Sequence, residues 1–130
     1  MAGIIWLASY PKSGNTWLRA FLHNLLRDPR EPYPINRLDD LVASASSRGW
    51  YDAAYGRPTR SLCDDEVLKL TPAAHGRIAR RSQDDVFVKT HSRMGACGGV
   101  DLTSGPLTAG AIYIMRNPDK LSRLDPVVVH

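Results

Sequence analysis

The chain has 130 residues, of which 43% are hydrophobic, which allows one domain with a modest core and excludes a disordered composition. Lys and Arg number 17 against 13 Asp and Glu, so the net charge of +4 favours anionic ligands, but the basic residues are too scattered to indicate nucleic acid. The N-terminal apolar run is too short for a membrane span and no basic segment precedes it, so we expect a soluble, cytoplasmic protein.

A strand, a polar turn and an amphipathic helix open the chain. The continuous apolar run over residues 3–9 predicts a buried parallel strand. The spacing over residues 15–27 predicts a helix that ends at Asp28 and Pro29. His23 falls outside the apolar face of this helix, and we expect a structural role for it. That face consists of Trp17, Leu18, Phe21, Leu22, Leu25 and Leu26.

The middle of the chain is less regular and rich in proline. A short helix is expected over residues 38–45. The side chains of Trp50, Tyr51 and Tyr55 are expected to pack on the core, because aromatic residues usually supply bulk there, or alternatively to line a pocket for a substrate.

Two helix starts follow. Asp64 and Asp65 are acidic residues of the kind that stabilise the positive end of a helix dipole. Thr71 is expected to cap a second helix, with Pro72 at its first position, that runs to about Arg81. His75 lies within this second helix, where a structural role is expected.

Two further buried strands are predicted, over residues 85–90 and 111–115, with a Gly-rich loop over residues 95–110 between them. Alternating strands and helices are typical of an α/β fold, with a central parallel sheet and helices on both faces. Ligands of such sheets bind beyond the carboxyl ends of the strands.

Reactive side chains follow all three of these predicted strands. Lys12 follows the first strand, Lys89 and His91 lie at the end of the second, and Arg116 follows the third. Because the carboxyl ends of parallel strands share one edge of the sheet, we expect these four residues to form a single site.

The turn after the first strand is suited to binding a phosphate. Backbone N–H groups at the helix start point outward, and the helix dipole places partial positive charge there. Gly14 allows close approach of an anion, Lys12 adds a full charge, and Ser13 and Thr16 add hydroxyl donors. The turn therefore predicts an anion-binding loop.

This loop differs from that of nucleoside triphosphatases, in which Lys and a magnesium-binding hydroxyl end the motif G-x-x-x-x-G-K-[ST]. Here Lys12 and Ser13 precede Gly14, and neither later strand ends in the aspartate expected of a magnesium site. Cys63 and Cys97 lack metal-binding spacing and are expected to be reduced structural thiols. We therefore expect no metal, and a transferred group less charged than a γ-phosphate, such as a sulfuryl group.

Three segments resemble a known family. Residues 10–17 (YPKSGNTW) resemble the 5′-phosphosulfate loop of the sulfotransferases that use 3′-phosphoadenosine 5′-phosphosulfate (PAPS). Residues 88–91 (VKTH) resemble the segment that carries the catalytic histidine of this family, and residues 112–118 (IYIMRNP) resemble the strand that ends in its 3′-phosphate-binding arginine. The resemblance covers residues 3–118 in order and separation, and implies a three-layer, P-loop-like fold.

The resemblance also implies roles for these residues. Lys12 would stabilise charge on the leaving phosphate, Lys89 would lie beside the sulfuryl group, and His91 would act as the general base. Arg116 would bind the 3′-phosphate, where a guanidinium suits bidentate contact. The 5′-phosphate and adenosine would be held by Lys12, Ser13, Gly14, Asn15, Thr16 and Trp17. PAPS would be the co-substrate, without a metal, and the acceptor a small molecule or carbohydrate.

The resemblance ends at Pro118. Family members continue into a helix whose serine, eight residues past the arginine, also binds the 3′-phosphate. The residue at that position here is Leu124, and Ser122 is offset by two residues, which turns it by roughly 200° on a helix. We therefore expect residues 1–130 to be a partial sulfotransferase domain with a divergent tail over residues 119–130. We expect its sheet to be incomplete at the C-terminus. We also expect the chain to self-associate and to be weakly active or inactive alone.

Two other functions remain open. A P-loop nucleotide kinase or phosphotransferase would bind ATP with magnesium and lose that binding on Lys12→Ala. A non-catalytic nucleotide-binding remnant would bind nucleotide without turnover. The acceptor is also open, since a phenol, a carbohydrate, a lipid alcohol and a protein side chain are all compatible with the sequence.

Overall fold

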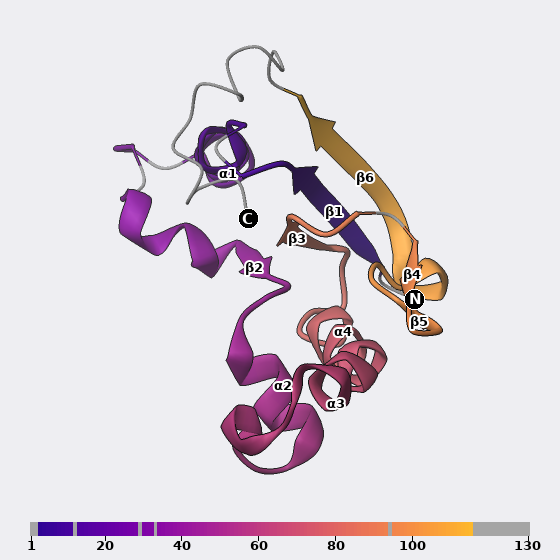
Figure 1. Ribbon diagram of the computed structural model, residues 1–130. Helices are drawn as coiled ribbons and strands as arrows, with labels where there is room; N and C mark the ends of the chain where they lie inside the picture. The colour runs from indigo at the N-terminus through magenta and orange to yellow at the C-terminus, as the bar shows by residue number, and fades with distance from the viewer. Residues whose placement is uncertain (1–2, 12, 29, 33, 94, 116–130) are drawn as a thin grey trace.

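The computed structural model describes residues 3–11, 13–28, 30–32, 34–93 and 95–115. A four-stranded sheet of order β2-β3-β1-β6 lies at its centre, with every neighbouring pair parallel (Figure 1). Its strands are β1 (Ile4–Ser9), β2 (Val42–Ser44), β3 (Val86–Thr90) and β6 (Thr108–Ile114). The predicted α/β fold with a central parallel sheet is therefore confirmed.

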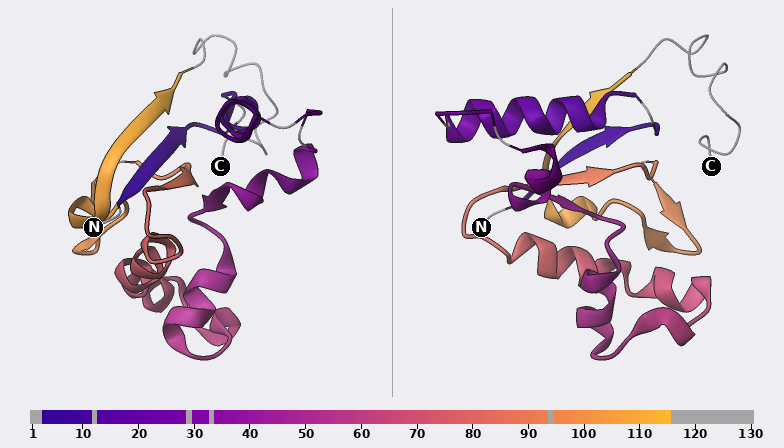
Figure 2. Two further views of the ribbon diagram at one scale, coloured as in Figure 1. Left: turned by 180° about the vertical axis from the view of Figure 1, so that it is seen from behind. Right: turned by 90° about the vertical axis from the view of Figure 1, so that its left-hand side faces the viewer.

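Helices lie on both sides of this sheet. Helix α1 lies on one side, and helices α2 to α4 lie on the other (Figure 2). These helices are α1 (Asn15–Arg27), α2 (Arg48–Tyr55), α3 (Asp64–Lys69) and α4 (Thr71–Ala79). The smaller elements are the 3-10 helices η1 (Ile35–Asp40), η2 (Thr59–Ser61) and η3 (Gly105–Leu107), and the hairpin of β4 (Ala96–Cys97) and β5 (Val100–Asp101). Within the described ranges, no helix has the length and apolar character needed to cross a membrane.

The core lies between the sheet and α4. Trp6 of β1, Val88 of β3 and Ile78 of α4 are sealed from solvent, and Trp50 of α2 packs against them. The clustered buried side chains are Ile4, Trp6, Ala43, Ala45, Ile78, Ala79, Val86 and Val88. The predicted packing of Trp50 on the core is thus confirmed.

The segment after Pro34 differs from the prediction. In place of a short helix over residues 38–45, η1 ends at Asp40 and β2 begins at Val42. Val42 and Ala43 pair with β3 and are buried, so sheet pairing outweighs the local helical pattern. Helix α2, which follows, was not predicted.

The boundaries of α4 and β6 also differ. Helix α4 begins at Thr71 itself, with Leu70 in the capping position predicted for Thr71. Strand β6 begins at Thr108, earlier than predicted, and the preceding Gly-rich loop contains β4, β5 and η3. The prediction of a buried third strand is wrong: within the described residues β6 pairs on one side only, and Ile112 and Tyr113 are 39% and 57% exposed.

Helix α1 does not bury its predicted apolar face. Four members of its predicted apolar face are exposed, whereas His23 is fully buried. Its buried residues are Asn15 and His23. The exposed members are Trp17, Phe21, Leu25 and Leu26.

Candidate functional site

The carboxyl ends of β1 and β3 meet at one edge of the sheet. Ala8 of β1 is in register with Thr90 of β3, and Leu7 with Lys89. The loop that follows β1 therefore begins beside the segment that carries Lys89 and His91, as the sequence predicts. Lys12 and Arg116, the other residues expected at this edge, lie outside the described residues.

The start of α1 is open to an anion. Gly14 precedes the helix with φ of 100°, a left-handed conformation that favours glycine. Within the described residues no side chain caps the first turn of α1, and that turn contains no acidic residue. None of the described side chains therefore neutralises its first N–H groups and the positive end of the helix dipole.

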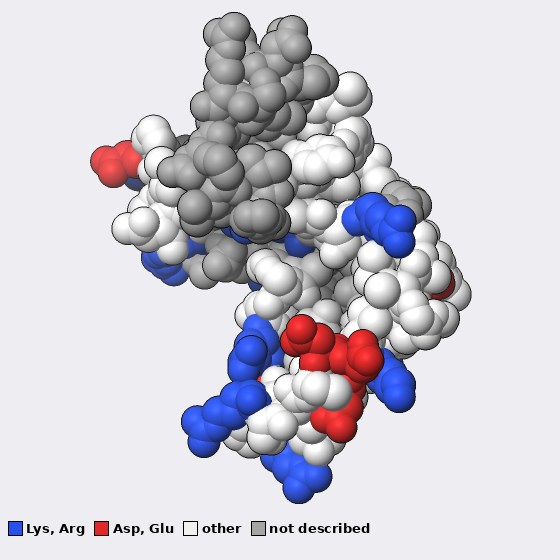
Figure 3. Space-filling view, viewed as in Figure 1, with Lys and Arg blue, Asp and Glu red and all other residues white. Residues whose placement is uncertain are grey.

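Helix α3 offers a contrast. Its first turn contains Asp64, Asp65 and Glu66, and the Glu66 carboxylate accepts a hydrogen bond from the Cys63 backbone at 3.2 Å. Acidic side chains gather over this helical part of the surface (Figure 3). The dipole of α3 is thus balanced by its own acidic residues, whereas no described acidic side chain balances that of α1.

Ser13 supports the same conclusion for the loop. The residue is 6% exposed, and its Oγ has no hydrogen-bond partner within the described part of the chain. An unsatisfied buried hydroxyl costs about 1–3 kcal/mol. A phosphate oxygen that accepted a hydrogen bond from this hydroxyl would remove that cost.

Asn15 holds the loop in place with its side chain. Its Nδ2 donates to the Leu7 carbonyl at 2.9 Å and to Ser9 Oγ at 3.2 Å, and the residue is buried. The side chain therefore fixes the start of α1 on the end of β1, so that Nδ2 is occupied and the backbone N–H is the Asn15 donor that remains for an anion. Thr16 and Trp17 are exposed, and the Trp17 ring is stacked on Phe21 at 5.6 Å.

His91 is oriented by the end of β1. Its Nδ1 lies 2.7 Å from the Ser9 carbonyl oxygen and 3.5 Å from Ser9 Oγ. Because a carbonyl only accepts, Nδ1 must carry the proton, and Nε2 of the neutral ring holds the lone pair. The exposed His91 ring is thus prepared to accept a proton at Nε2.

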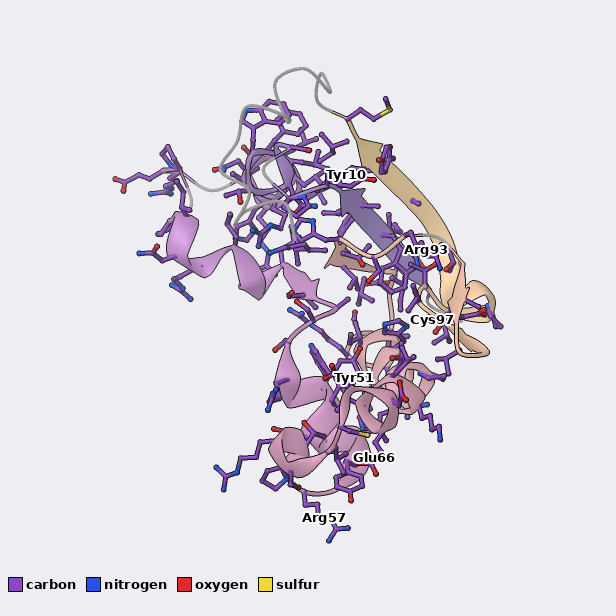
Figure 4. The ribbon with its side chains drawn as sticks, viewed as in Figure 1. Tyr10, Tyr51, Arg57, Glu66, Arg93 and Cys97 are labelled. Atoms are coloured by element: carbon purple, nitrogen blue, oxygen red, sulfur yellow. The ribbon has the colours of Figure 1, made fainter. Side chains whose placement is uncertain are left out.

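A cavity of about 420 Å³ adjoins Lys89, Thr90 and His91. It lies between the ends of β2 and β3 and the helices α2 to α4, and Figure 4 shows Tyr51 on the part of α2 near α4. Its other lining residues are Ser44, Ala45, Ser46, Tyr51, Asp64, Val67, Leu68, Thr71, His75, Ser92 and Leu102. Tyr51 therefore follows the alternative expectation of lining a pocket.

The sequence did not associate His75 with this site, because a histidine within a helix gives no signal of the cavity beside it. Both cysteines are free, as expected, and both are exposed. Among the described residues, no three His, Cys, Asp or Glu side chains are grouped to hold a metal ion. No protein-family model matches the chain, and no curated protein matches it.

Proposed function

We propose that the chain is a sulfotransferase that moves the sulfuryl group of PAPS to a hydroxyl or amine acceptor, on a P-loop-like variant of the α/β fold. One observation carries the proposal: the uncapped start of α1 and the basic Nε2 of His91 belong to the same edge of the sheet. The Ser9 carbonyl that orients His91 ends the strand from which the anion-binding loop departs.

The donor side of the proposed site is the loop and the start of α1. Backbone N–H groups and the Ser13 hydroxyl would hold the 5′-phosphate. From the resemblance of the sequence motifs, Lys12 would stabilise the charge that develops on the leaving phosphate. Arg116 would bind the 3′-phosphate. Lys89, which borders the cavity, would lie beside the sulfuryl group.

The reaction needs one proton acceptor and a fixed geometry. The acceptor oxygen forms a bond to sulfur while the bond from sulfur to the bridging phosphate oxygen breaks, and adenosine 3′,5′-bisphosphate leaves. The acceptor proton passes to Nε2 of His91. In-line transfer of this kind depends mainly on positioning and on stabilisation of developing charge.

Calorimetric titration with adenosine 3′,5′-bisphosphate tests the donor site. We expect binding that does not require magnesium and that weakens about 10- to 100-fold in Lys12→Ala, because a charge-assisted contact is lost. Arg57→Ala, two residues beyond the end of α2 and at the bottom of Figure 4, is the matched control and should bind normally. Magnesium-dependent binding of ATP, without binding of adenosine 3′,5′-bisphosphate, would contradict the sulfotransferase proposal and favour a nucleotide kinase.

Turnover with PAPS and a phenol tests the base. His91→Ala should lower kcat about 10²- to 10⁴-fold and leave the Kd of adenosine 3′,5′-bisphosphate unchanged. A measurable kcat that is equal in His91→Ala and the wild type would remove His91 from the mechanism.

A further inference from the structure

A second imidazole borders the cavity and has no part in the proposed transfer. His75 of α4 is 1% exposed and lines the same space as Lys89 and His91. Cavities of about 300–1000 Å³ hold small molecules and orient them with a few fixed polar groups among apolar walls. His75 has the position of such a group.

Two contacts from outside the cavity fix the His75 ring. Its Nδ1 lies 2.9 Å from Ser104 Oγ, and its ring meets that of Trp6 edge-on at 5.1 Å. Ser104 and Trp6 are both buried, and neither lines the cavity. The ring is therefore held in place by residues that do not line the cavity.

The remaining nitrogen of His75 has no partner in the described structure. Nε2 makes no hydrogen bond within the described residues. The cavity is the space that this side chain borders. Burial lowers the pKa of His75, so the ring is neutral near pH 7.

The rest of the lining indicates what kind of molecule fits. Tyr51, Val67, Leu68 and Leu102 supply apolar surface suited to a ring or short hydrocarbon. The charged lining residues Asp64 and Lys89 have opposite signs, so the cavity has no strong preference for a charged body. This favours an uncharged molecule with an apolar centre.

We propose that His75 is a specificity-determining residue, whose Nε2 hydrogen-bonds a second polar group of the acceptor while the reacting hydroxyl lies at His91. The acceptor class is then an uncharged alcohol or phenol with an apolar body and polar groups at two ends. This inference rests on the proposed function, because the bound molecule is a sulfuryl acceptor only if the chain is a sulfotransferase. Binding of that molecule can be measured without sulfuryl transfer.

The test compares aromatic diols with analogues in which a methyl group replaces one hydroxyl. Hydroquinone is paired with para-cresol, and a biphenyl with a hydroxyl on each end is paired with its hydroxyl–methyl analogue, so that two spans are sampled. Binding is measured by NMR titration with and without adenosine 3′,5′-bisphosphate. We expect the wild type to prefer the diol of at least one pair by about 3- to 10-fold, the value of one neutral hydrogen bond.

His75→Asn removes the polar atom at the Nε2 position while its amide can still contact Ser104, and His75→Phe keeps the ring and its packing on Trp6. Both should bind the diol and its analogue equally. Leu102→Ala, a control in the apolar wall, should weaken both members of a pair and keep the preference.

Two results would overturn the role of His75: no diol preference in the wild type, or a preference that persists in His75→Asn and His75→Phe. If a diol preference is found that both His75 variants abolish, but adenosine 3′,5′-bisphosphate fails to bind, then the proposed function fails and His75 remains the recognition group of a cavity with another purpose. Nucleotide binding without a diol preference leaves the sulfotransferase proposal standing and refutes this one.

Discussion

The two sides of the sheet differ in how completely their apolar side chains are buried. On the side of α4, the sheet and the helices enclose side chains such as Ile78 that are 0% exposed. On the side of α1 and along β6, large apolar side chains such as Leu25 remain 60% exposed within the described structure. The spacing of apolar residues in a sequence therefore identifies the apolar face of a helix. It does not show whether another part of the protein covers that face.

The largest expected effect separates these two sides directly. Ile78→Ala should lower the free energy of unfolding by about 2–5 kcal/mol, because it leaves a cavity in the enclosed side. Leu25→Ala, the matched control on α1, should change it by less than about 0.5 kcal/mol, since its side chain is largely exposed. Urea denaturation of both variants gives the comparison, and similar losses would mean that the exposed face is covered in solution.

A second effect concerns the link from β6 to the enclosed side. Trp6 Nε1 donates to Thr108 Oγ1 at 2.8 Å, and Thr108 Oγ1 donates to the Ser104 carbonyl at 2.8 Å. Thr108→Val removes the hydroxyl and leaves the indole N–H without its acceptor, which should cost about 1–3 kcal/mol in urea denaturation. Thr16→Val, at an exposed threonine, should be nearly neutral. A neutral Thr108→Val would contradict the link.

The smallest effect is a pH dependence confined to the enclosed side. Burial holds the pKa of folded His75 below its unfolded value of about 6.5, so the unfolded chain binds the proton more readily. The stability contributed by neutral His75 is present above about pH 6.5 and is lost as the pH falls below it. Thermal unfolding between pH 5 and 8 should therefore show a steeper loss in the wild type than in His75→Asn, and parallel profiles would refute this role of burial.

The parts of the fold that the sequence predicts are those with a strong local pattern. The apolar runs of β1 and β3 and the spacing of α1 place those elements correctly. Strand β2 was missed because three residues are too few for a periodic signal and Val42 is fixed by pairing with β3. The exposure of β6 was missed because an apolar run is the same for a central strand and an edge strand.

The candidate site divides in the same way. The sequence predicts that His91 shares an edge with the loop, since this follows from the parallel order of the strands. It does not predict that Ser9 orients the His91 ring, or that Asn15 holds α1 on β1, because both contacts depend on how side chains meet after folding. His75 reaches the cavity for the same reason, through packing of α4 on the sheet.

The central claim is that the open start of α1 binds the phosphates of the sulfuryl donor beside His91. Amide NMR spectra recorded during titration with adenosine 3′,5′-bisphosphate test it most directly. We expect the largest shifts at the amides of residues 13–17, smaller shifts at His91, and none at the balanced start of α3. Saturable binding that shifts other regions and leaves residues 13–17 unchanged would contradict the claim.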